Sequence, residues 1–446
     1  MSQPREAPPG MLPVERLGLH LEPNQSRVLL RPFMPSLVVK PTSGPGDRRR
    51  LEVLLDRLAA LPAEESEREL ERLRHRFGVR HRTLETLARQ RWQAVLAPLQ
   101  WQHRLGAEQQ LLLGYYLTNE YALESAALFN PSLVPHPDQS GLEAGSLRVV
   151  LSLRATGEGH ISSIEFRSAV IGAEGDLHLD RVSPFVYQGE ISELKGDGEA
   201  SYLVSYEEDS QLSERVLFPV AARESNGLED ARFVMLEGES PRYLATATAY
   251  DGRGIHTQLI ETDDFRQFRL RPLQGSAIRN KGLAFFPRRI HGQWWMLGRQ
   301  DSENIHLMTS DRPDCWHHSQ VLLCPQEPWE FIQLGNCGSP LETSAGWLVL
   351  THGVGPMREY CIGAALLDLE DPTRVIGRLR QPLLRATDDE RDGYVPNVVY
   401  SCGGLIHAEQ LWLPYAVSDR ATRMARVPLP ALLERLCHDA PRGMDS

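Results

Sequence analysis

Two adjacent carboxylates stand at the mouth of an apolar run near the middle of the chain, in the stretch "SNGLEDARF". Glu229 and Asp230 lie side by side, and Arg232 follows two positions after Asp230. The run beginning at Phe233 predicts a buried strand, whose end is a rigid mount for a functional group. Acid catalysis needs a carboxyl group tuned by a neighbouring charge and by partial burial. The structural alternative is an exposed ion pair at a strand entry, which this stretch alone fits better.

The composition is that of a globular protein without a polyanionic partner. The chain has 446 residues, 41% hydrophobic and 24% charged, and 48 basic against 59 acidic residues give a net charge of −11. Only Arg48–Arg50 forms a basic run, and no segment reaches membrane-spanning length. We therefore expect neither nucleic acid nor a membrane as partner. The first residues contain no apolar signal core, which favours a cytoplasmic location. The six cysteines form no C-x-x-C pair, so we expect no metal.

The first part of the chain has a helical pattern. Leu51, Leu54, Leu55 and Leu58 recur at helical spacing, Pro62 then interrupts the pattern, and charged amphipathic segments continue it. We expect residues 1–134 to form a helical region. Amphipathic helices have to bury their apolar stripes, so we expect this region to assemble a homo-oligomer.

From Ser146 onward short β-like runs recur with a long period. Their aromatic starts, Tyr243, Trp294, Trp347 and Trp412, are 51, 53 and 65 residues apart. Periods of about 40–50 residues with four strands each are typical of β-propeller blades. Residues 146–240 would supply a further blade, whereas a β-sandwich gives no reason for the period. We therefore predict an all-β core, a five-bladed β-propeller over residues 135–430, followed by a C-terminal tail over 431–446.

Such a fold would bring polar residues at matching places in the blades onto one central channel. Those places hold Tyr250 with Asp251, Arg299, His352 and Asp419. A ring of mixed charges and hydroxyls at a channel mouth suits a polar ligand such as a sugar.

Four motifs occur in order at this spacing: "GLEDAR", "IRNKGLAFFPRRIHGQWWMLGR", "GWLVLTHGVGPMREYCIGAALLDLEDP" and "LPYAVSD". Together they resemble glycoside hydrolase family 130, the β-mannoside phosphorylases and related β-mannosidases. The resemblance extends from about Asn130 to Leu429, with Ala231 where the family usually has proline. It implies a five-bladed β-propeller with its site in the central channel.

The resemblance also implies a reaction, the inverting phosphorolysis of β-mannooligosaccharides to mannose 1-phosphate. Asp230 would be the proton donor, acting through a sugar hydroxyl, and inorganic phosphate would be the co-substrate, with no other cofactor. Arginine suits the phosphate site because its guanidinium fork fits phosphate oxygens. The phosphate-binding positions are Arg279, Asn280, Lys281, Arg299, His352 and Tyr360. The substrate-binding positions are Arg154, Glu229, Arg232, Asp301, Glu342 and Asp419.

Glu342 departs from the family pattern, which places a phosphate-binding lysine in that region. If phosphate is the nucleophile, Glu342 has to be turned away or paired, with Lys281 or Arg358 as candidate partners. If water is the nucleophile, Glu342, Asp301 or Glu303 would be the base of an inverting β-mannosidase. The retained cations favour phosphate, because such a cluster around a water would be costly to bury. A non-catalytic sugar-binding propeller is the alternative of a different class.

Overall fold

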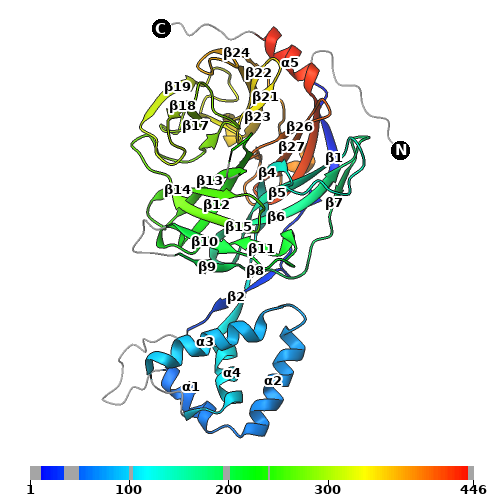
Figure 1. The fold of residues 1–446 in the computed structure, drawn as a ribbon. Helices are drawn as coiled ribbons and strands as arrows, with labels where there is room; N and C mark the ends of the chain where they lie inside the picture. The colour runs from blue at the N-terminus through cyan, green and yellow to red at the C-terminus, as the bar shows by residue number, and fades with distance from the viewer. Residues whose placement is uncertain (1–11, 35–49, 100–103, 194–200, 240–241, 440–446) are drawn as a thin grey trace. The chain divides into compact units, whose positions relative to one another are not determined.

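The computed structural model describes residues 12–34, 50–99, 104–193, 201–239 and 242–439. The chain divides into two compact units (Figure 1). The larger unit comprises residues 1–24, 124–182 and 188–446, and the smaller unit comprises residues 25–123 and 183–187. Each unit is described by itself below.

The smaller unit is a group of four helices with one two-stranded antiparallel sheet, whose strands precede and follow the helices in the sequence. Leucines on one side of each helix are buried together, as their spacing predicted, and include Leu51, Leu55, Leu58 and Leu70. The close packing of two helices depends on Gly114, where a Cβ would lie 2.0 Å from the Ala88 carbonyl oxygen. The elements are α1 (Arg50–Ala59), α2 (Ala63–Phe77), α3 (Leu84–Leu99), α4 (Ala107–Tyr116), β2 (Val28–Pro32) and β3 (Thr118–Ala122).

The larger unit consists mainly of antiparallel strands (Figure 1). Its first sheet has 12 strands and contains two successive meanders, β4–β7 and β12–β15, with four short strands between them. The meander strands are β4 (Ala127–Pro135), β5 (Leu147–Thr156), β6 (Ser162–Ile171), β7 (Leu177–Leu179), β12 (Gly227–Met235), β13 (Tyr243–Tyr250), β14 (Ile255–Thr262) and β15 (Gln267–Pro272). The short strands are β8 (Tyr187–Gln188), β9 (Glu190–Ser192), β10 (Tyr202–Ser205) and β11 (Arg215–Leu217).

Three further sheets follow in sequence order. The first contains β16 (Ala284–Phe285), β17 (Trp294–Gly298), β18 (Ile305–Ser310) and β19 (His318–Leu323). The second contains β20 (Gln333–Asn336), β21 (Leu341–Thr343), β22 (Gly346–Val354), β23 (Tyr360–Leu367) and β24 (Val375–Arg378). The third contains β25 (Val399–Tyr400), β26 (Leu405–His407), β27 (Gln410–Val417), β28 (Ala421–Pro428) and β1 (Glu15–Leu21).

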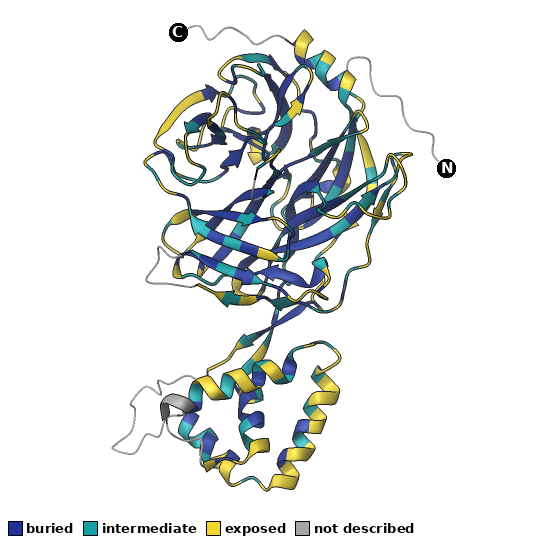
Figure 2. Ribbon diagram, viewed as in Figure 1, coloured by how far each residue is buried: buried dark blue, intermediate teal, exposed yellow. Residues whose placement is uncertain are grey.

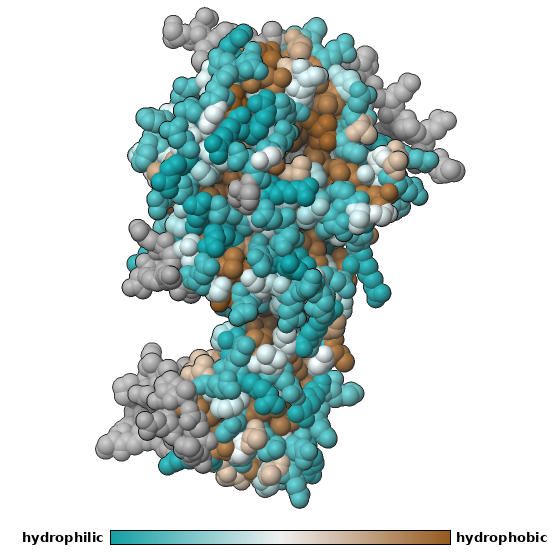
Figure 3. Space-filling view, viewed as in Figure 1, coloured by the Kyte–Doolittle hydropathy of each residue, from teal (hydrophilic) through white to brown (hydrophobic). Residues whose placement is uncertain are grey.

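The recurring aromatic residues mark the same long strand in each of four sheets. Tyr243 begins β13 and Trp294 begins β17, while Trp347 and Trp412 lie within the first three residues of β22 and β27. All four are buried, and Figure 2 shows that many strands of this unit are buried along much of their length. The period seen in the sequence therefore corresponds to a repeated β-hairpin. On the face drawn in Figure 3, hydrophilic side chains cover much of this unit, with hydrophobic ones showing between them.

Residues 1–134, expected to be a helical region, contain strands as well as the four helices. Residues 15–21 form β1, which pairs antiparallel with β28 and supplies the edge of the last sheet. Arg426 of β28 bonds Glu15 of β1 at 2.6 Å, and this pairing joins segments about 400 residues apart. β4 also begins before residue 134. Local pattern cannot reveal such pairing, because the partner strand is distant in sequence.

The C-terminal segment also differs from the expected tail. Residues 429–438 form α5 (Leu429–His438), and its Leu432 and Leu436 are fully buried in the core shared by β22, β23 and β27. Across the described ranges, no helix is both long and apolar enough to cross a membrane.

Candidate active site

Asp230 and Asn130 occupy matching bulges in the first strands of the two meanders. β12 is bulged between Glu229 and Arg232, and β4 is bulged between Phe129 and Ser132. Asp230 and Asn130 have φ angles of 53° and 49°, in the left-handed region that Asn and Asp tolerate best among residues with a side chain. Each bulge turns one polar side chain away from the ladder. Asn130 Nδ2 donates a hydrogen bond of 2.7 Å to Asp230 Oδ1.

A partly buried arginine joins the two carboxylates of the opening motif. Arg154 Nη2 bonds Glu229 Oε1 at 2.8 Å, and its Nη1 lies 3.4 Å from Asp230 Oδ1. Its Nε bonds the Ser162 hydroxyl at 2.9 Å, which fixes the guanidinium in place. The backbone of Gly227 packs closely against Ser162. With φ 140°, a Cβ at Gly227 would lie 2.9 Å from the Ser162 nitrogen, so a larger residue would push the two strands apart. The motif is therefore part of a buried network and not an exposed ion pair.

The three carboxyl groups of this network have different proton affinities. Burial raises the pKa of Asp230, but the nearby charges of Arg154, Arg232 and Lys281 outweigh burial and hold that pKa below its usual range. Burial raises the pKa of Asp419 to about 6, with Arg154 opposing the change. Burial also raises the pKa of Glu229, again against Arg154. Carboxyl groups whose pKa values are pushed apart in one cleft are typical of acid–base sites.

Arg232 is buried and bonds the backbone of Asp230. It is 2% exposed, its Nη1 donates to the Asp230 carbonyl at 2.9 Å, and its Nη2 donates to the Tyr400 hydroxyl at 2.6 Å. The carbonyl contact holds the left-handed backbone of Asp230. Arg232 is thus placed to position Asp230 and has little surface left for a ligand.

A second group of residues lies beside Arg232. Arg299 Nη1 donates to His352 Nε2 at 3.0 Å, and the His352 ring stacks on Tyr360 at 6.1 Å between centroids. The Tyr400 ring meets His352 edge-on at 4.8 Å. Burial, together with the charges of Arg299 and Arg232, holds the pKa of His352 well below its usual range. His352 is therefore neutral and orients Arg299 instead of adding a positive charge.

Several buried polar atoms in the Asp230 group and the Arg299–His352 group have no hydrogen-bond partner in the part of the chain that the structure describes. The buried atoms Asn130 Oδ1, Arg232 Nε, Arg299 Nε and Asn336 Oδ1 have no hydrogen-bond partner among the described residues. Buried polar groups are normally satisfied, and unsatisfied ones concentrated at one place indicate a ligand or ordered water. The arrangement has the chemistry of a site for an anionic or hydroxyl-rich molecule.

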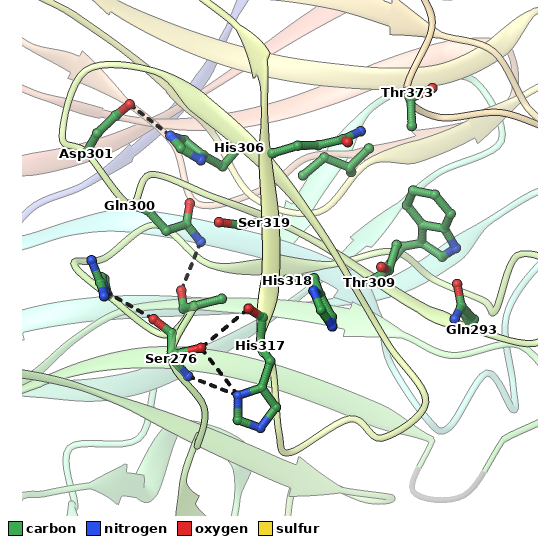
Figure 4. Close-up of a pocket in the computed structure, with 15 residues that line it drawn as sticks. Ser276, Gln293, Gln300, Asp301, His306, Thr309, His317, His318, Ser319 and Thr373 are labelled. Atoms are coloured by element: carbon green, nitrogen blue, oxygen red, sulfur yellow. Dashed lines mark hydrogen bonds and ion pairs between the residues drawn. The ribbon is translucent and has the colours of Figure 1, made fainter.

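The structure does not bring Arg279 and Asp301 to this group. Both line an open cavity of about 960 Å³ along β19, which contains none of Asp230, His352 and Tyr360. Figure 4 shows Asp301 and His306 on one side of this strand and Thr309 and Gln293 on the other. Arg279 Nε bonds the Ser276 carbonyl.

Two of the predicted residues have structural partners near that cavity. Asp301 accepts hydrogen bonds from two backbone amides, from Asn304 and from His306, which makes it the residue that closes the β17–β18 turn. Asn280, at φ 59°, donates to the Arg299 carbonyl at 3.0 Å and so braces Arg299.

Glu342 lies away from the group and is paired with a residue that the sequence did not indicate. Both of its oxygens bond Arg288, at 2.7 Å each, where we expected Lys281 or Arg358. Glu342 pairs with Trp347 across the β21–β22 ladder, whereas His352 lies five residues further along β22. At about 3.3 Å per residue this is a separation of roughly 17 Å along the strand. Glu342 therefore neither faces the His352 group nor is placed to act as its base.

Asn130 and Tyr400 belong to the site but were missed in the sequence. A repeated signal could have found Asn130, since an Asn or Asp lies in each first strand or up to four residues before it: Asn130, Asp230, Asn280, Asn336 and Asn397. Four of these five have positive φ, all except Asn336. Tyr400 carries no such signal, because only the fold brings its hydroxyl to Arg232. In the described part of the chain, no group of three or more His, Cys, Asp and Glu is arranged to hold a metal ion.

Comparison with known proteins agrees with these motifs. The chain is 29% identical over 218 residues to the 1,2-beta-oligomannan phosphorylase of Thermoanaerobacter sp. (strain X514), covering 48% of this chain and 73% of that protein. It is 30% identical over 229 residues to the beta-1,2-mannobiose phosphorylase of Listeria innocua serovar 6a, covering 49% of this chain and 63% of that protein, so the match spans less than two thirds of that relative.

Solved structures share the fold. The Listeria innocua beta-1,2-mannobiose phosphorylase in complex with beta-1,2-mannobiose superposes with a TM-score of 0.51 at 21% identity, over 70% of this chain and 92% of that one. A second structure has a TM-score of 0.51 at 19% identity, over 69% and 86% of the two chains. It comes from a family of mannoside phosphorylases that contains glycoside hydrolases targeting beta-1,2 mannosidic linkages in Candida mannan.

A family model described as beta-1,4-mannooligosaccharide phosphorylase matches residues 157–437, well over half of the chain. The motifs that suggested the family lie mainly within this range. The chain belongs to glycoside hydrolase family 130.

Proposed function

We propose that this protein is an inverting glycoside phosphorylase that cleaves β-mannosides with inorganic phosphate and releases mannose 1-phosphate. The observation that carries the proposal is a buried carboxylate, Asp230, beside an arginine–histidine–tyrosine group in which Arg299 Nε has no hydrogen-bond partner among the described residues. Membership of the family and the phosphorylase names of the relatives support it.

Asp230 is assigned as the proton donor, acting through a sugar hydroxyl as in the family. In the unliganded protein its pKa is low because Arg154, Arg232 and Lys281 surround it against the effect of burial. A bound phosphate would offset part of this positive charge, and a bound sugar would exclude water from the carboxylate. Both changes raise the proton affinity of a carboxylate. Asp230 therefore holds its proton more strongly when phosphate and sugar are both bound, as a general acid requires.

Phosphate is assigned to Arg299, His352, Tyr360 and Lys281. Arg299 has one buried donor without a partner in the described ranges, Nε, and the contacts of its Nη1 with His352 and of its carbonyl with Asn280 hold its orientation. Because phosphate itself attacks the anomeric carbon, positioning and charge stabilisation replace a protein base. Arg279 is left out of the assignment, since its side chain lines the β19 cavity.

The arrangement of sheets supports a five-bladed β-propeller as the scaffold. The two meanders of the first sheet and the three later sheets make five successive antiparallel units. In this interpretation β1 closes the last blade, which is a common requirement when a chain forms a ring of sheets. The first strands, with Asn130, Asp230 and Asn336 among their residues, would then surround the channel.

A hydrolase is the second candidate, because a protein of similar fold comes from a family with members that hydrolyse beta-1,2 mannosidic linkages. A base for water would come from Glu229 or Asp419, since Glu342 and Asp301 are bound elsewhere and Glu303 is exposed in the turn that Asp301 closes. For Asp419 the raised pKa, about 6, is compatible with that role.

We also propose that the protein is a homo-oligomer. The smaller unit exposes large apolar side chains, including Val79 at 71% and Phe33 at 50%. A contact between chains would remove such side chains from water, which is favourable. Sedimentation of the full chain at several concentrations tests this, and a monomer throughout would contradict it.

Product analysis tests the main proposal. The protein is incubated with β-1,2- or β-1,4-mannobiose, with and without phosphate. We expect mannose 1-phosphate only when phosphate is present. Free mannose released at an unchanged rate without phosphate would replace the proposal with the hydrolase, and no turnover of any β-mannoside would favour a non-catalytic sugar-binding protein.

A further inference from the structure

A closed loop borders the candidate site between β24 and β25. Arg391 Nε donates to Asn397 Oδ1 at 2.9 Å, and the Asn397 amide donates to the Arg391 carbonyl at 3.2 Å. These two bonds tie the ends of the loop, residues 391–397, to each other. A loop tied in this way loses little conformational freedom when it binds a ligand.

The same loop is attached to the site on two sides. The Val395 amide donates to the carbonyl of Ser418, the neighbour of Asp419, at 3.0 Å. The Tyr360 amide donates to the Asn397 carbonyl at 3.0 Å. Gly393 lies so close to the β27–β28 turn that a Cβ there would be 2.6 Å from Ser418 Cβ. The loop therefore lies along one edge of the candidate site, from Asp419 to Tyr360. This edge is called the rim below.

Tyr394 stands at the tip of this loop with its side chain 61% exposed. Its ring centroid lies 6.0 Å from that of His160, with the planes 35° apart. His160 belongs to the β5–β6 turn, two residues before Ser162, the serine that holds Arg154. An aromatic pair thus projects into solvent next to the arginine that binds Glu229 and Asp230.

We propose that Tyr394 and His160 form a stacking surface for the sugar that leaves when the mannosyl group is transferred. The inference rests on the proposed function and deepens it. Asp230 and His352 are 5% and 1% exposed, so the transferred mannosyl unit lies inside the site. The remainder of the oligosaccharide then has to extend outward across the rim. An aromatic face offers the apolar side of a sugar ring a large contact area, and the tethered loop presents that face without reordering.

Synthesis in the reverse direction tests the stacking surface, with mannose 1-phosphate as donor and mannose as acceptor. The wild type is compared with Tyr394→Ala, Tyr394→Phe and the control Phe331→Ala, whose side chain is 63% exposed on another loop. An aromatic contact is worth about a tenfold change in affinity, so we expect Tyr394→Ala to raise KM for the acceptor about tenfold. KM for mannose 1-phosphate should stay within about twofold, because that substrate does not reach the rim. Tyr394→Phe should restore the acceptor KM.

Three results would overturn the inference in a wild-type protein that makes mannose 1-phosphate. They are an unchanged acceptor KM in Tyr394→Ala, an equal rise in Phe331→Ala, and a parallel rise in KM for mannose 1-phosphate. A wild type that forms no mannose 1-phosphate contradicts the proposed function instead. Calorimetric binding of mannobiose to the wild type and Tyr394→Ala then tests the surface without turnover, and equal affinities would reject it.

Discussion

The Asn130 amide donates a 2.7 Å hydrogen bond to the Asp230 carboxylate, and both residues sit at left-handed bulges in the first strands of successive meanders. A left-handed bulge of the same kind thus positions both the candidate acid, Asp230, and the residue that donates a hydrogen bond to it, Asn130. Because Asn130 bonds the charged form of Asp230, it contributes to holding the pKa of that carboxyl low, after the larger effects of the surrounding arginines and lysine and against burial.

Replacing the proposed proton donor should abolish turnover without unfolding the protein. Asp230→Asn keeps the size and the left-handed conformation of the residue, while general-acid loss costs about 100- to 10,000-fold in rate. We expect kcat for mannobiose phosphorolysis to fall in that range, with mannobiose affinity retained by calorimetry. Near-normal turnover of an unactivated mannoside would remove Asp230 from the role.

Removing the hydrogen bond to Asp230 should shift the pH profile. Asn130→Ala takes away a donor that favours the carboxylate, so the pKa of Asp230 should rise. Since a general acid acts in its protonated form, activity is lost as pH rises through this pKa, and the basic limb should move to higher pH. The measurement is kcat against pH, because kcat reports the pKa of the acid in the enzyme–substrate complex. A limb that does not move, or that moves to lower pH, would contradict this relationship.

Asp419 should limit stability near neutral pH. Its folded-state pKa is raised by burial to about 6, so the unfolded chain releases this proton at lower pH than the folded chain does. Stability from this group is therefore full below about pH 4 and is lost as pH rises through about 6. Asp419→Asn, which suits φ 49°, should raise the free energy of unfolding at pH 7 by about 1–2 kcal/mol. Denaturant titration should show a smaller gain at pH 4, and an equal gain at both pH values would exclude the titration as its cause.

The hydroxyl of Tyr400 should matter for both stability and activity. Tyr400→Phe leaves Arg232 Nη2 without its 2.6 Å acceptor in a buried place, which costs about 1–3 kcal/mol. We expect a lower unfolding midpoint and a lower kcat, since Arg232 also holds the Asp230 carbonyl. Tyr415→Phe, which also removes a buried hydroxyl but one bonded to Glu390, serves as the control with unchanged kcat. Equal loss of kcat in both variants would show a general packing effect.

Glu342 should be dispensable for chemistry. Glu342→Gln breaks a half-exposed pair with Arg288, and such pairs contribute about 0–1 kcal/mol to stability. We expect product formation at wild-type rates, measured with and without phosphate. An inactive variant would return Glu342 to the role of base and favour hydrolysis.

The sequence by itself determined the repeat of long β-hairpins, the helical pattern near residues 50–58, and the motif containing Asp230. These features can be predicted because each is visible in the order of residues along the chain: the hydrophobic periodicity, the spacing of aromatic residues and a short run of charged residues. Through its resemblance to a family, the sequence also assigned Arg154 to the sugar and Arg299, His352 and Tyr360 to phosphate. In the structure Arg154 bonds Asp230, and the other three residues form a second group.

Only the tertiary structure decided which side chains meet. Arg279 precedes Asn280 in the chain, yet Arg279 lines the cavity along β19 whereas Asn280 bonds the Arg299 carbonyl. Glu342 was separated from His352 by strand register, and Tyr400 reached Arg232 across 168 residues. β1 pairs with β28, which lies near the other end of the chain. Such contacts depend on pairing between distant segments, and that pairing is set by the burial of whole sheet faces, which no short stretch of sequence contains.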